Sequence, residues 1–410
     1  MLRSKSWTFA ALAVVMAGCG HTTAGEAHPV PQPPSTSVNT ALLDPGQYPT
    51  TPSPPLGAAG STEAGRRVEG RRMAAYVTGP WQADAGLVDP ESNSPATVIE
   101  NFDQFARVVW TPIAGGAYAL PFVVGFMSER QARGPEPRMS LRNAVLRFAD
   151  ATTATTAAQG MHARAMAMPR EPTATPIVTE PERAVPIPGH PDAAASLLTF
   201  QEGAQTEREL TALTAHGPYV LVQVVRCATG TDCQAPLVAR TLDLQIPLID
   251  TFAPTPADQF AALPADPTGL VARTLPLPPD QATSTDGAAY PPAGALHLED
   301  DPVAVGPALT AAGVDDVAAN RTTVYQAKDP GAAQSLAQAY SDMAAKTAGA
   351  QAAAPVPGLA GSHCTRVAGA NGLVPRYWCL AAADRYAIKT VARQLDSAQQ
   401  QMAAQYRMLT

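Results

Sequence analysis

The feature that most constrains the fold of this 410-residue chain is an internal repeat. A strand-like stretch at residues 143–148 is followed by an Ala/Thr-rich segment and then by Val-Pro-Ile-Pro-Gly at 185–189. The same order recurs at 322–327, in an Ala-rich segment, and in Ala-Pro-Val-Pro-Gly at 354–358. Each Pro-x-Pro-Gly precedes strand candidates, a pair of cysteines and a closing segment. The matched order predicts two bodies built on one plan.

Strand and helix patterns alternate within both bodies. Clusters of β-branched and aromatic residues predict strands in the first body at 105–110, 120–126, 143–148, 196–200, 219–226 and 238–246. Both faces of 219–225 are apolar except at Gln223, which predicts a central strand covered on both sides. Residues 151–168 have the composition of a helix that ends before Pro169. Residues 63–78 also read as a helix, although Gly65 and Gly70 weaken this prediction.

The second body has the clearer helical periodicity. Apolar residues recur at helical spacing from Ala333 to Met343 and again from Val391 to Leu409, as in amphipathic helices that lie on a sheet. Residues 385–390 alternate between apolar and polar side chains, as a half-buried strand does. The predicted fold class is therefore α+β, with two related domains that each contain an antiparallel sheet, packed helices and one disulfide.

Proline clusters suggest where the domains begin and end. The chain has 41 prolines, about double the usual 5%, and many of them lie in two intervals. We expect a Pro/Ser/Thr-rich tether at 19–60 and an interdomain linker at 253–291. An N-terminal domain would then span 61–252, and a C-terminal domain 292–410.

The first nineteen residues have the pattern of an export signal. Arg3 and Lys5 precede an apolar run at 7–16, which is too short to span a bilayer. Small residues then lead into Cys19, and the arrangement resembles a bacterial lipobox. The resemblance implies that residues 1–18 are removed and that Cys19 carries acyl chains such as palmitate, which anchor the protein to the cell membrane on its extracytoplasmic face. The alternative is an ordinary cleaved signal with an accidental cysteine.

The other four cysteines are expected to form disulfides outside the cytoplasm. Three pairings are possible, and the spacing favours Cys227 with Cys233 and Cys364 with Cys379. Asn371-Gly372 lies midway between Cys364 and Cys379, and this dipeptide is typical of hairpin tips. Metal binding and redox catalysis are the competing interpretations. Both are weak, because neither pair has Cys-x-x-Cys spacing.

Charge restricts the classes of partner. The formal net charge is −7, and an acidic chain is a poor candidate for binding nucleic acid. Four arginines, Arg66, Arg67, Arg71 and Arg72, cluster within the first predicted helix. They could form a site for an anion or a lipid headgroup, or they could be the solvated face of that helix.

The usual signatures of catalysis are missing from the sequence. The sequence contains no Gly-x-Ser-x-Gly, His-Glu-x-x-His, Walker loop or Gly-x-Gly-x-x-Gly. Acidic pairs at 300–301 and 315–316 could bind calcium, but helix capping or solvated turns explain them more simply. We therefore predict no catalytic residue, no metal site and no cofactor.

Three further stretches resemble a family of lipoproteins from mycobacteria and related actinobacteria. They are Leu-Asp-Pro-Gly-Gln-Tyr-Pro-Thr-Thr-Pro-Ser-Pro-Pro-Leu-Gly at 43–57, Arg-Met-Ala-Ala-Tyr-Val at 72–77 with Gly-Pro-Trp at 79–81, and Ala-Ala-Gln-Tyr-Arg-Met-Leu at 403–409. The family is a domain of unknown function with an N-terminal and a C-terminal part. The resemblance implies a location in the cell envelope and transfers no catalytic residue.

These observations lead to a functional expectation. We expect a lipid-anchored envelope protein that acts as a non-enzymatic binding or interaction module and captures a small molecule, a lipid or a protein near the membrane. A lipid carrier would contain a deep apolar cavity. An envelope-directed hydrolase with dispersed catalytic residues is the alternative from another class, and it would bring a nucleophile, a base and an orienting group together in a cleft.

Overall fold

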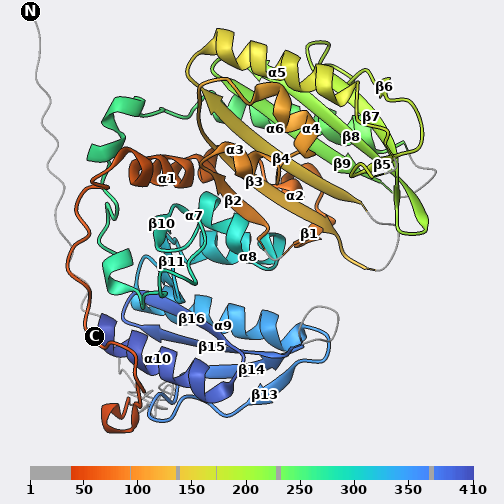
Figure 1. The fold of residues 1–410 in the computed structure, drawn as a ribbon. Helices are drawn as coiled ribbons and strands as arrows, with labels where there is room; N and C mark the ends of the chain where they lie inside the picture. Colours follow the sequence, from red (N-terminus) through yellow and green to blue (C-terminus); the bar gives the residue numbers. More distant parts are fainter. Residues whose placement is uncertain (1–37, 93, 135–138, 172, 228–231, 369–373) are drawn as a thin grey trace, which may run out of the picture. The chain divides into compact units, whose positions relative to one another are not determined.

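A computed structural model describes residues 38–92, 94–134, 139–171, 173–227, 232–368 and 374–410. It contains two antiparallel sheets, each covered by helices (Figure 1). The N-terminal half contains strands β1 to β9, and the C-terminal half contains β10 to β16. The α+β fold class is as predicted from the sequence.

The N-terminal sheet has the strand order β1-β3-β4-β9-β8-β7-β5, while β2 pairs with β3 and β6 with β7. Its strands are β1 (Leu87–Asp89), β2 (Ala96–Ile99), β3 (Phe122–Ala132), β4 (Ser140–Phe148), β5 (Ile177–Val178), β6 (Arg183–Ala184), β7 (Ala194–Glu202), β8 (Gln205–His216) and β9 (Tyr219–Arg226). Strand β9 lies between β4 and β8 and is buried as far as Val225. The prediction of a central strand there is confirmed.

Two helices cover opposite faces of this sheet. Helix α5 (Ala151–Ala165) packs on the face that includes Phe148 and Val222. Helix α6 (Gln234–Ile249) packs on the other face, against Val145. The remaining elements of this half are η1 (Thr40–Leu42), α1 (Thr62–Met73), η2 (Ala74–Tyr76), α2 (Pro80–Ala83), α3 (Phe102–Phe105), α4 (Thr111–Ala114), η3 (Gly115–Ala117) and η4 (Ala257–Ala262), and η5 (Val271–Arg273) begins the C-terminal half.

The C-terminal sheet has the order β10-β11-β12-β16-β15-β14-β13. Its strands are β10 (Ala288–Tyr290), β11 (Asp316–Ala319), β12 (Thr322–Gln326), β13 (Gln351–Ala353), β14 (His363–Val367), β15 (Arg376–Ala383) and β16 (Tyr386–Ala392). Its helices are α7 (Pro292–Ala295), η6 (Leu296–Leu298), α8 (Pro302–Ala311), α9 (Pro330–Lys346) and α10 (Leu395–Leu409). Helix α9 packs on the face with Tyr325, and α10 on the face with Val324, because successive strand residues point to opposite sides.

The predicted duplication is visible in the topology. The order β3-β4-β9-β8-β7-β5 matches β11-β12-β16-β15-β14-β13 strand for strand. Helix α5 follows β4 with Asp150 as its N-cap, and α9 follows β12 with Asp329 as its N-cap. The two Pro-x-Pro-Gly motifs end at Gly189 and Gly358, and both glycines have a positive φ that other residues rarely adopt. The two halves are therefore versions of one fold.

A buried glutamine in each half forms equivalent hydrogen bonds. In the N-terminal half, the side-chain carbonyl of Gln245 on α6 accepts from Thr78 N and from Asn143 Nδ2, both at 2.9 Å. Its amide donates to the Tyr76 carbonyl at 2.9 Å. The glutamine thus ties the residues after η2 to the helix and to β4.

Gln405 on α10 has the same role in the C-terminal half. Its carbonyl accepts from Leu275 N at 2.7 Å and from Thr322 Oγ1 at 2.6 Å, and its amide donates to the Arg273 carbonyl at 2.8 Å. In this comparison η5 takes the place of η2. Thr322 takes the place of Asn143, as the repeat in the sequence implies. Helix α1, which precedes η2, has no helical counterpart directly before η5.

Two strand predictions were wrong. Residues 238–246 lie inside α6. Leu242, Leu244 and Ile246 alternate with polar residues as a strand would, but so short an alternation does not distinguish a strand from a helix. The buried positions Val238, Leu242 and Gln245 follow helical spacing. Residues 105–110 begin at the last residue of α3 and continue without strand structure.

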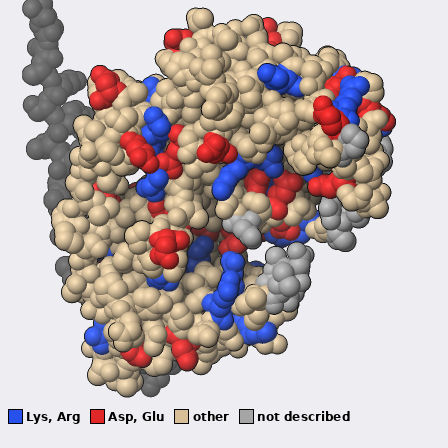
Figure 2. Space-filling view, in the orientation of Figure 1, with Lys and Arg blue, Asp and Glu red and all other residues tan. Residues whose placement is uncertain are grey.

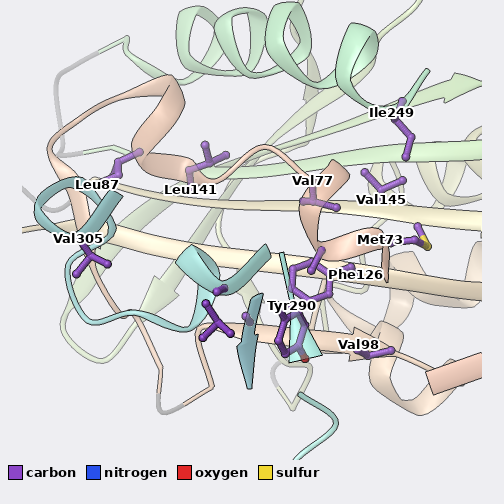
Figure 3. Close-up of a cluster of buried hydrophobic side chains, with 14 of the residues drawn as sticks. Met73, Val77, Leu87, Val98, Phe126, Leu141, Val145, Ile249, Tyr290 and Val305 are labelled. Atoms are coloured by element: carbon purple, nitrogen blue, oxygen red, sulfur yellow. The ribbon is translucent and has the colours of Figure 1, made fainter. Parts of the chain in front are cut away.

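Apolar side chains from both halves meet in one cluster. It includes Phe126 and Val145 from the N-terminal sheet and Tyr290 and Tyr325 from the C-terminal sheet (Figure 3 labels the first three). The interval predicted as a linker, 253–291, contains η4, η5 and strand β10. The described part of the predicted tether begins at Val38. Along it, Leu43 is buried, and its carbonyl accepts a hydrogen bond from Arg407 of α10.

Candidate functional site

Helix α1 carries the arginine cluster that the sequence singled out. Ser61 caps its first turn by accepting a hydrogen bond from Ala64 N at 3.1 Å. The helix continues through Gly65 and Gly70. Glycine is needed at both positions because neighbouring atoms pack closely against them. A Cβ atom at Gly65 would lie 2.0 Å from the Phe260 carbonyl oxygen, and one at Gly70 would lie 2.2 Å from a methyl group of Val98.

Two of the four arginines have structural roles. Arg71 donates to the backbone carbonyls of Ser284, Asp286 and Gly287, and burial lowers its guanidinium pKa. Arg72 pairs with Glu69 at 2.5 Å. These contacts fix the segment after residue 283 and the inner face of α1. Neither arginine is simply a solvated charge.

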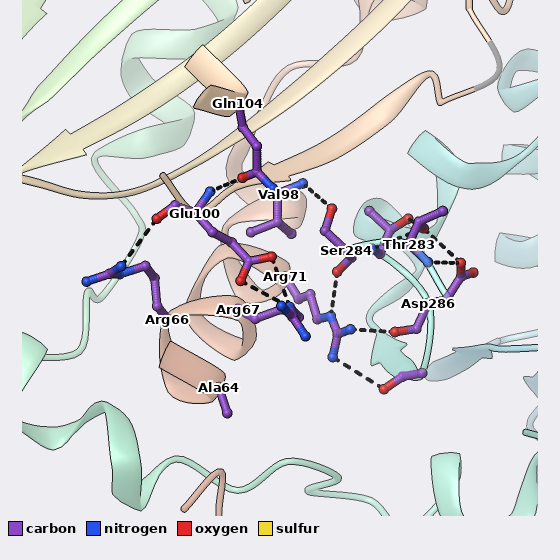
Figure 4. A network of polar contacts seen from close by, with 12 residues as sticks. Ala64, Arg66, Arg67, Arg71, Val98, Glu100, Gln104, Thr283, Ser284 and Asp286 are labelled. Carbon is purple, nitrogen blue, oxygen red and sulfur yellow. Dashed lines mark hydrogen bonds and ion pairs between the residues drawn. The ribbon is translucent and has the colours of Figure 1, made fainter. Parts of the chain in front are cut away.

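The other two arginines surround Glu100 (Figure 4). Arg67 Nε donates to both carboxylate oxygens of Glu100, at 2.9 and 3.1 Å, and this hydrogen bonding raises the guanidinium pKa. Arg66 donates from Nη1 to the Glu100 carbonyl at 3.3 Å. Glu100 is held in turn by Gln104, whose side-chain carbonyl accepts from the Glu100 backbone N at 2.5 Å. Arg67 thus holds the carboxylate of Glu100, and Arg66 holds its backbone carbonyl.

Two polar hollows adjoin this network. The first has a volume of about 410 Å³ and is lined by Thr62, Glu63, Arg66, Arg67, Glu100, Asn101 and Gln104. The second has a volume of about 440 Å³ and is lined by Arg67, Arg71, Glu100, Gln104, Pro279, Ala282, Thr283, Ser284 and Asp286. They share Arg67, Glu100 and Gln104. Figure 2 shows basic and acidic side chains side by side in this part of the surface.

Several donors in the hollows remain available to a ligand. Arg67 uses only Nε toward Glu100, so its two terminal amino groups have no partner among the described residues. Within the same part of the chain, Arg66 Nε also has no hydrogen bond, but it is buried and is not exposed to the hollow. Gln104 uses its carbonyl, which leaves its NH₂ group to donate. This arrangement can bind and orient a polar ligand.

A serine and a histidine also meet, but not as a catalytic pair. His297 Nδ1 lies 2.8 Å from Ser128 Oγ, and Nε2 lies 3.1 Å from the Val77 carbonyl. Ser128 is 0% exposed and His297 1%. Desolvation, and then the charge of Arg130, lower the imidazole pKa to about 3. A base this weak, sealed from solvent, cannot activate a serine toward a substrate.

A buried ion pair distinguishes the C-terminal sheet. Lys389 Nζ of β16 lies 2.6 Å from Glu299 Oε2, and Tyr325 donates to Glu299 Oε1 at 2.6 Å. Nζ also lies 5.1 to 5.8 Å from the ring centres of Tyr325, Tyr340 and Trp378. Burial raises the pKa of both tyrosine hydroxyls well above the usual value. The ammonium group is therefore held by a carboxylate and by aromatic faces.

The equivalent position in the N-terminal half is apolar. Strand pairing aligns Asn143 with Gln223 and Thr322 with Thr390, so the residue before Gln223 corresponds to Lys389. That residue is Val222, which is buried under α5. The same site in the fold thus holds a valine in one half and an ion pair in the other.

One disulfide lies in each half, as predicted. Cys227 pairs with Cys233 between the end of β9 and the start of α6. Cys364 pairs with Cys379, and these residues face each other across β14 and β15 with Cα atoms 4.1 Å apart. This separation is typical of a non-hydrogen-bonded pair. The tip predicted at 371–372 and the lipidation site Cys19 lie outside the described residues.

The remaining candidates have ordinary structural partners. Asp301 caps α8 by accepting from Ala304 N, which agrees with the capping interpretation. Asp315 pairs with Arg385. In the ranges that the structure describes, three or more His, Cys, Asp or Glu side chains do not converge in a way that could hold a metal ion. Within those ranges, none of the helices has the length and apolar character needed to cross a membrane.

Comparisons with known proteins give a family for both halves. Residues 56–265 match the profile described as domain of unknown function (DUF7373) N-terminal, and residues 270–410 match DUF7373 C-terminal. None of the curated proteins compared matches the chain. Among solved structures, the extracellular domain of PknH from Mycobacterium tuberculosis is similar over 42% of this chain and 94% of that domain, with 17% identity and a TM-score of 0.29.

Proposed function

This chain belongs to the DUF7373 family through both of its halves, and we propose that it is an extracytoplasmic binding protein anchored to the cell membrane by a lipid on Cys19. It captures a polar ligand in the hollows beside α1 and performs no chemistry on it. The observation that carries this proposal is the pair of adjoining hollows around Arg67, Glu100 and Gln104.

Three further observations support it. Two disulfides suit an oxidising compartment outside the cytoplasm. The hollows are of the size of ligand pockets, which is roughly 300–1,000 Å³. The Ser128–His297 contact is sealed in the core and so offers no nucleophile to a bound substrate.

Native mass spectrometry tests the binding function. The lipoprotein is purified from membranes in mild detergent as wild type, Arg67→Gln and Arg240→Gln. Arg240 is the matched control, because it is also an exposed helical arginine beside a carboxylate, 3.6 Å from Asp84. We expect a non-covalently bound mass on the wild type and on Arg240→Gln, and its loss from Arg67→Gln. No bound mass on any form, or the same mass on all three, would contradict the proposal.

Metabolic labelling tests the anchor. Cells that express the wild type or Cys19→Ala are fed an alkyne-bearing palmitate analogue, and the purified chains are analysed after coupling to a fluorophore. We expect label on the wild type in the membrane fraction and none on the variant. An unlabelled wild type, or a variant that keeps its label, would refute acylation of Cys19.

A further inference from the structure

We infer that the ligand of the α1 hollows is an anionic polyol, a molecule in which a phosphate or carboxylate group adjoins several hydroxyl groups. This inference rests on the proposed function and specifies the chemistry of its ligand. It follows from a difference between the two hollows, because Arg66 lines only the first, whereas Ser284 and Asp286 line only the second.

The first hollow fits the acidic group. Arg66 and Arg67 both line it, and a planar guanidinium binds carboxylate and phosphate oxygens in pairs. Glu100 already accepts from Arg67 Nε, so it orients the guanidinium, whose outer amino groups have no partner among the described residues. The NH₂ group of Gln104 adds a neutral donor.

The charge balance argues against a bare anion. Glu100 and the exposed Glu63 offset Arg66 and Arg67, so the formal net charge of the first hollow is zero. A simple anion would gain little from such a site by attraction alone. A ligand that also forms hydrogen bonds elsewhere would be favoured, and the second hollow supplies the partners.

The second hollow fits hydroxyl groups. Ser284 Oγ accepts from Val98 N at 3.1 Å, so its own hydrogen can be donated. Asp286 Oδ2 accepts from the backbone N and Oγ1 of Thr283, at 2.8 and 2.7 Å, which leaves Oδ1 as an acceptor. A hydroxyl group both donates and accepts, and it can therefore use such a pair of partners. Arg67 and Gln104 line both hollows and would contact the two parts of one ligand.

The same chemistry could reach the site from two sources. A sugar phosphate would arrive free in solution, whereas a phospholipid with a polyol headgroup would be presented by a membrane. Hollows of about 410 and 440 Å³ accommodate a hexose phosphate or a glycerol phosphate headgroup. The experiment therefore includes a soluble probe and a membrane probe.

Calorimetric titration of the full lipoprotein in detergent tests the ligand class. The probes are glucose 6-phosphate, glucose and inorganic phosphate. We expect glucose 6-phosphate to bind at least tenfold more tightly than either of the others. Arg66→Gln/Arg67→Gln should weaken its binding tenfold or more, since a hydrogen bond to a charged group is lost at each position. Ser284→Ala should weaken the binding of glucose 6-phosphate severalfold and leave the binding of inorganic phosphate unchanged. Arg240→Gln should bind each probe as tightly as the wild type does.

A vesicle arm identifies the source. Flotation with phosphatidylglycerol vesicles, compared with phosphatidylcholine vesicles, uses the unacylated Cys19→Ala chain so that the lipid anchor does not contribute. Arginine-dependent binding to phosphatidylglycerol alone would support the headgroup source, and binding to glucose 6-phosphate alone would support the free source. Equal binding of phosphate and glucose 6-phosphate would overturn the polyol. Unchanged binding by the double arginine variant would overturn the site.

This experiment is separable from the test of the proposed function. If no probe binds while native mass spectrometry still finds a ligand that Arg67→Gln loses, the ligand class is wrong and the binding function stands. If the bound mass is absent as well, the proposed function fails. Circular dichroism melting of each variant distinguishes loss of the site from loss of the fold.

Discussion

The two halves of this molecule share a backbone plan but use it differently. Gln245 and Gln405 form the same three hydrogen bonds, and the sheets have the same strand order. The N-terminal half adds α1 with its arginines and hollows, and it keeps an apolar residue, Val222, at the centre of its sheet. The C-terminal half has a buried ion pair at that position. The duplicated framework therefore supports a polar surface site beside α1, to which residues 279–286 contribute, and a buried ion pair in the C-terminal sheet.

The largest loss of stability is expected from a substitution at the position where the two sheets differ most. Lys389→Val copies the residue of the N-terminal half, but it leaves Glu299 buried without its cation. The free energy of unfolding should fall by about 3–5 kcal/mol. Urea denaturation followed by tryptophan fluorescence measures it.

The double variant Lys389→Val/Glu299→Gln is the control for that change. It removes both charges, so it should regain most of the lost stability. A single variant within about 1 kcal/mol of the wild type would show that the pair is not buried as described.

A second prediction concerns the stability of the protein at low pH. The pKa of His297 is about 3 in the folded chain and about 6.5 in an unfolded chain. Between these values the unfolded chain binds more protons, so stability should fall as the pH drops from about 6.5 toward 3. At pH 4.5 the loss from this residue should be about 2–3 kcal/mol.

Comparison of urea denaturation at pH 7 and pH 4.5 tests it. His297→Gln should lose less stability between the two conditions than the wild type. His363→Gln, at an exposed histidine of β14, should lose as much as the wild type. Equal losses in all three proteins would refute the assignment to His297.

The equivalence of the two glutamines gives the third prediction. Gln245→Ala and Gln405→Ala each leave a backbone N–H and a carbonyl without their partner in the core, so each should cost about 1–3 kcal/mol. The two costs should agree within about 1 kcal/mol, whereas Gln159→Ala on the exposed face of α5 should be nearly neutral. A large effect in one half only would break the equivalence.

The smallest effect on stability is expected in α1. Arg67 is 42% exposed and pairs with Glu100 near the surface, so Arg67→Gln should cost no more than about 1 kcal/mol. The same change should weaken ligand binding enough that the bound mass is lost in native mass spectrometry. A melting temperature that falls by more than that of Lys389→Val would make Arg67 a structural residue.

Much of the framework follows from local sequence patterns. Strand β9 was predicted with its observed bounds, and the Ala-rich segments form α5 and α9. Helix α6 is read as a strand from the sequence because Leu242, Leu244 and Ile246 alternate with polar residues, and the burial of the polar Thr241 and Gln245 hides its helical period. Strand β8 was not predicted, because charged residues fill its first half and its pairing with β7 and β9 is set by tertiary contacts.

The site could be predicted only in part. The arginines of α1 stand out in the sequence, but their partner Glu100 is more than 30 residues away. The segment that holds Arg71 is more than 200 residues away. Tertiary packing brings these segments together, and no local sequence pattern predicts these contacts. The contacts of the α1 arginines in the structure, and not the sequence, therefore distinguish a binding surface from a solvated helix face.

Hydrogen exchange with glucose 6-phosphate tests the central claim most directly, because it compares both halves in one experiment. We expect slower exchange in α1 and at residues 279–286, with no change in β12, β16 and α9 of the C-terminal half. Slowed exchange in the C-terminal sheet, or unchanged exchange in α1 when the ligand is bound, would contradict the account.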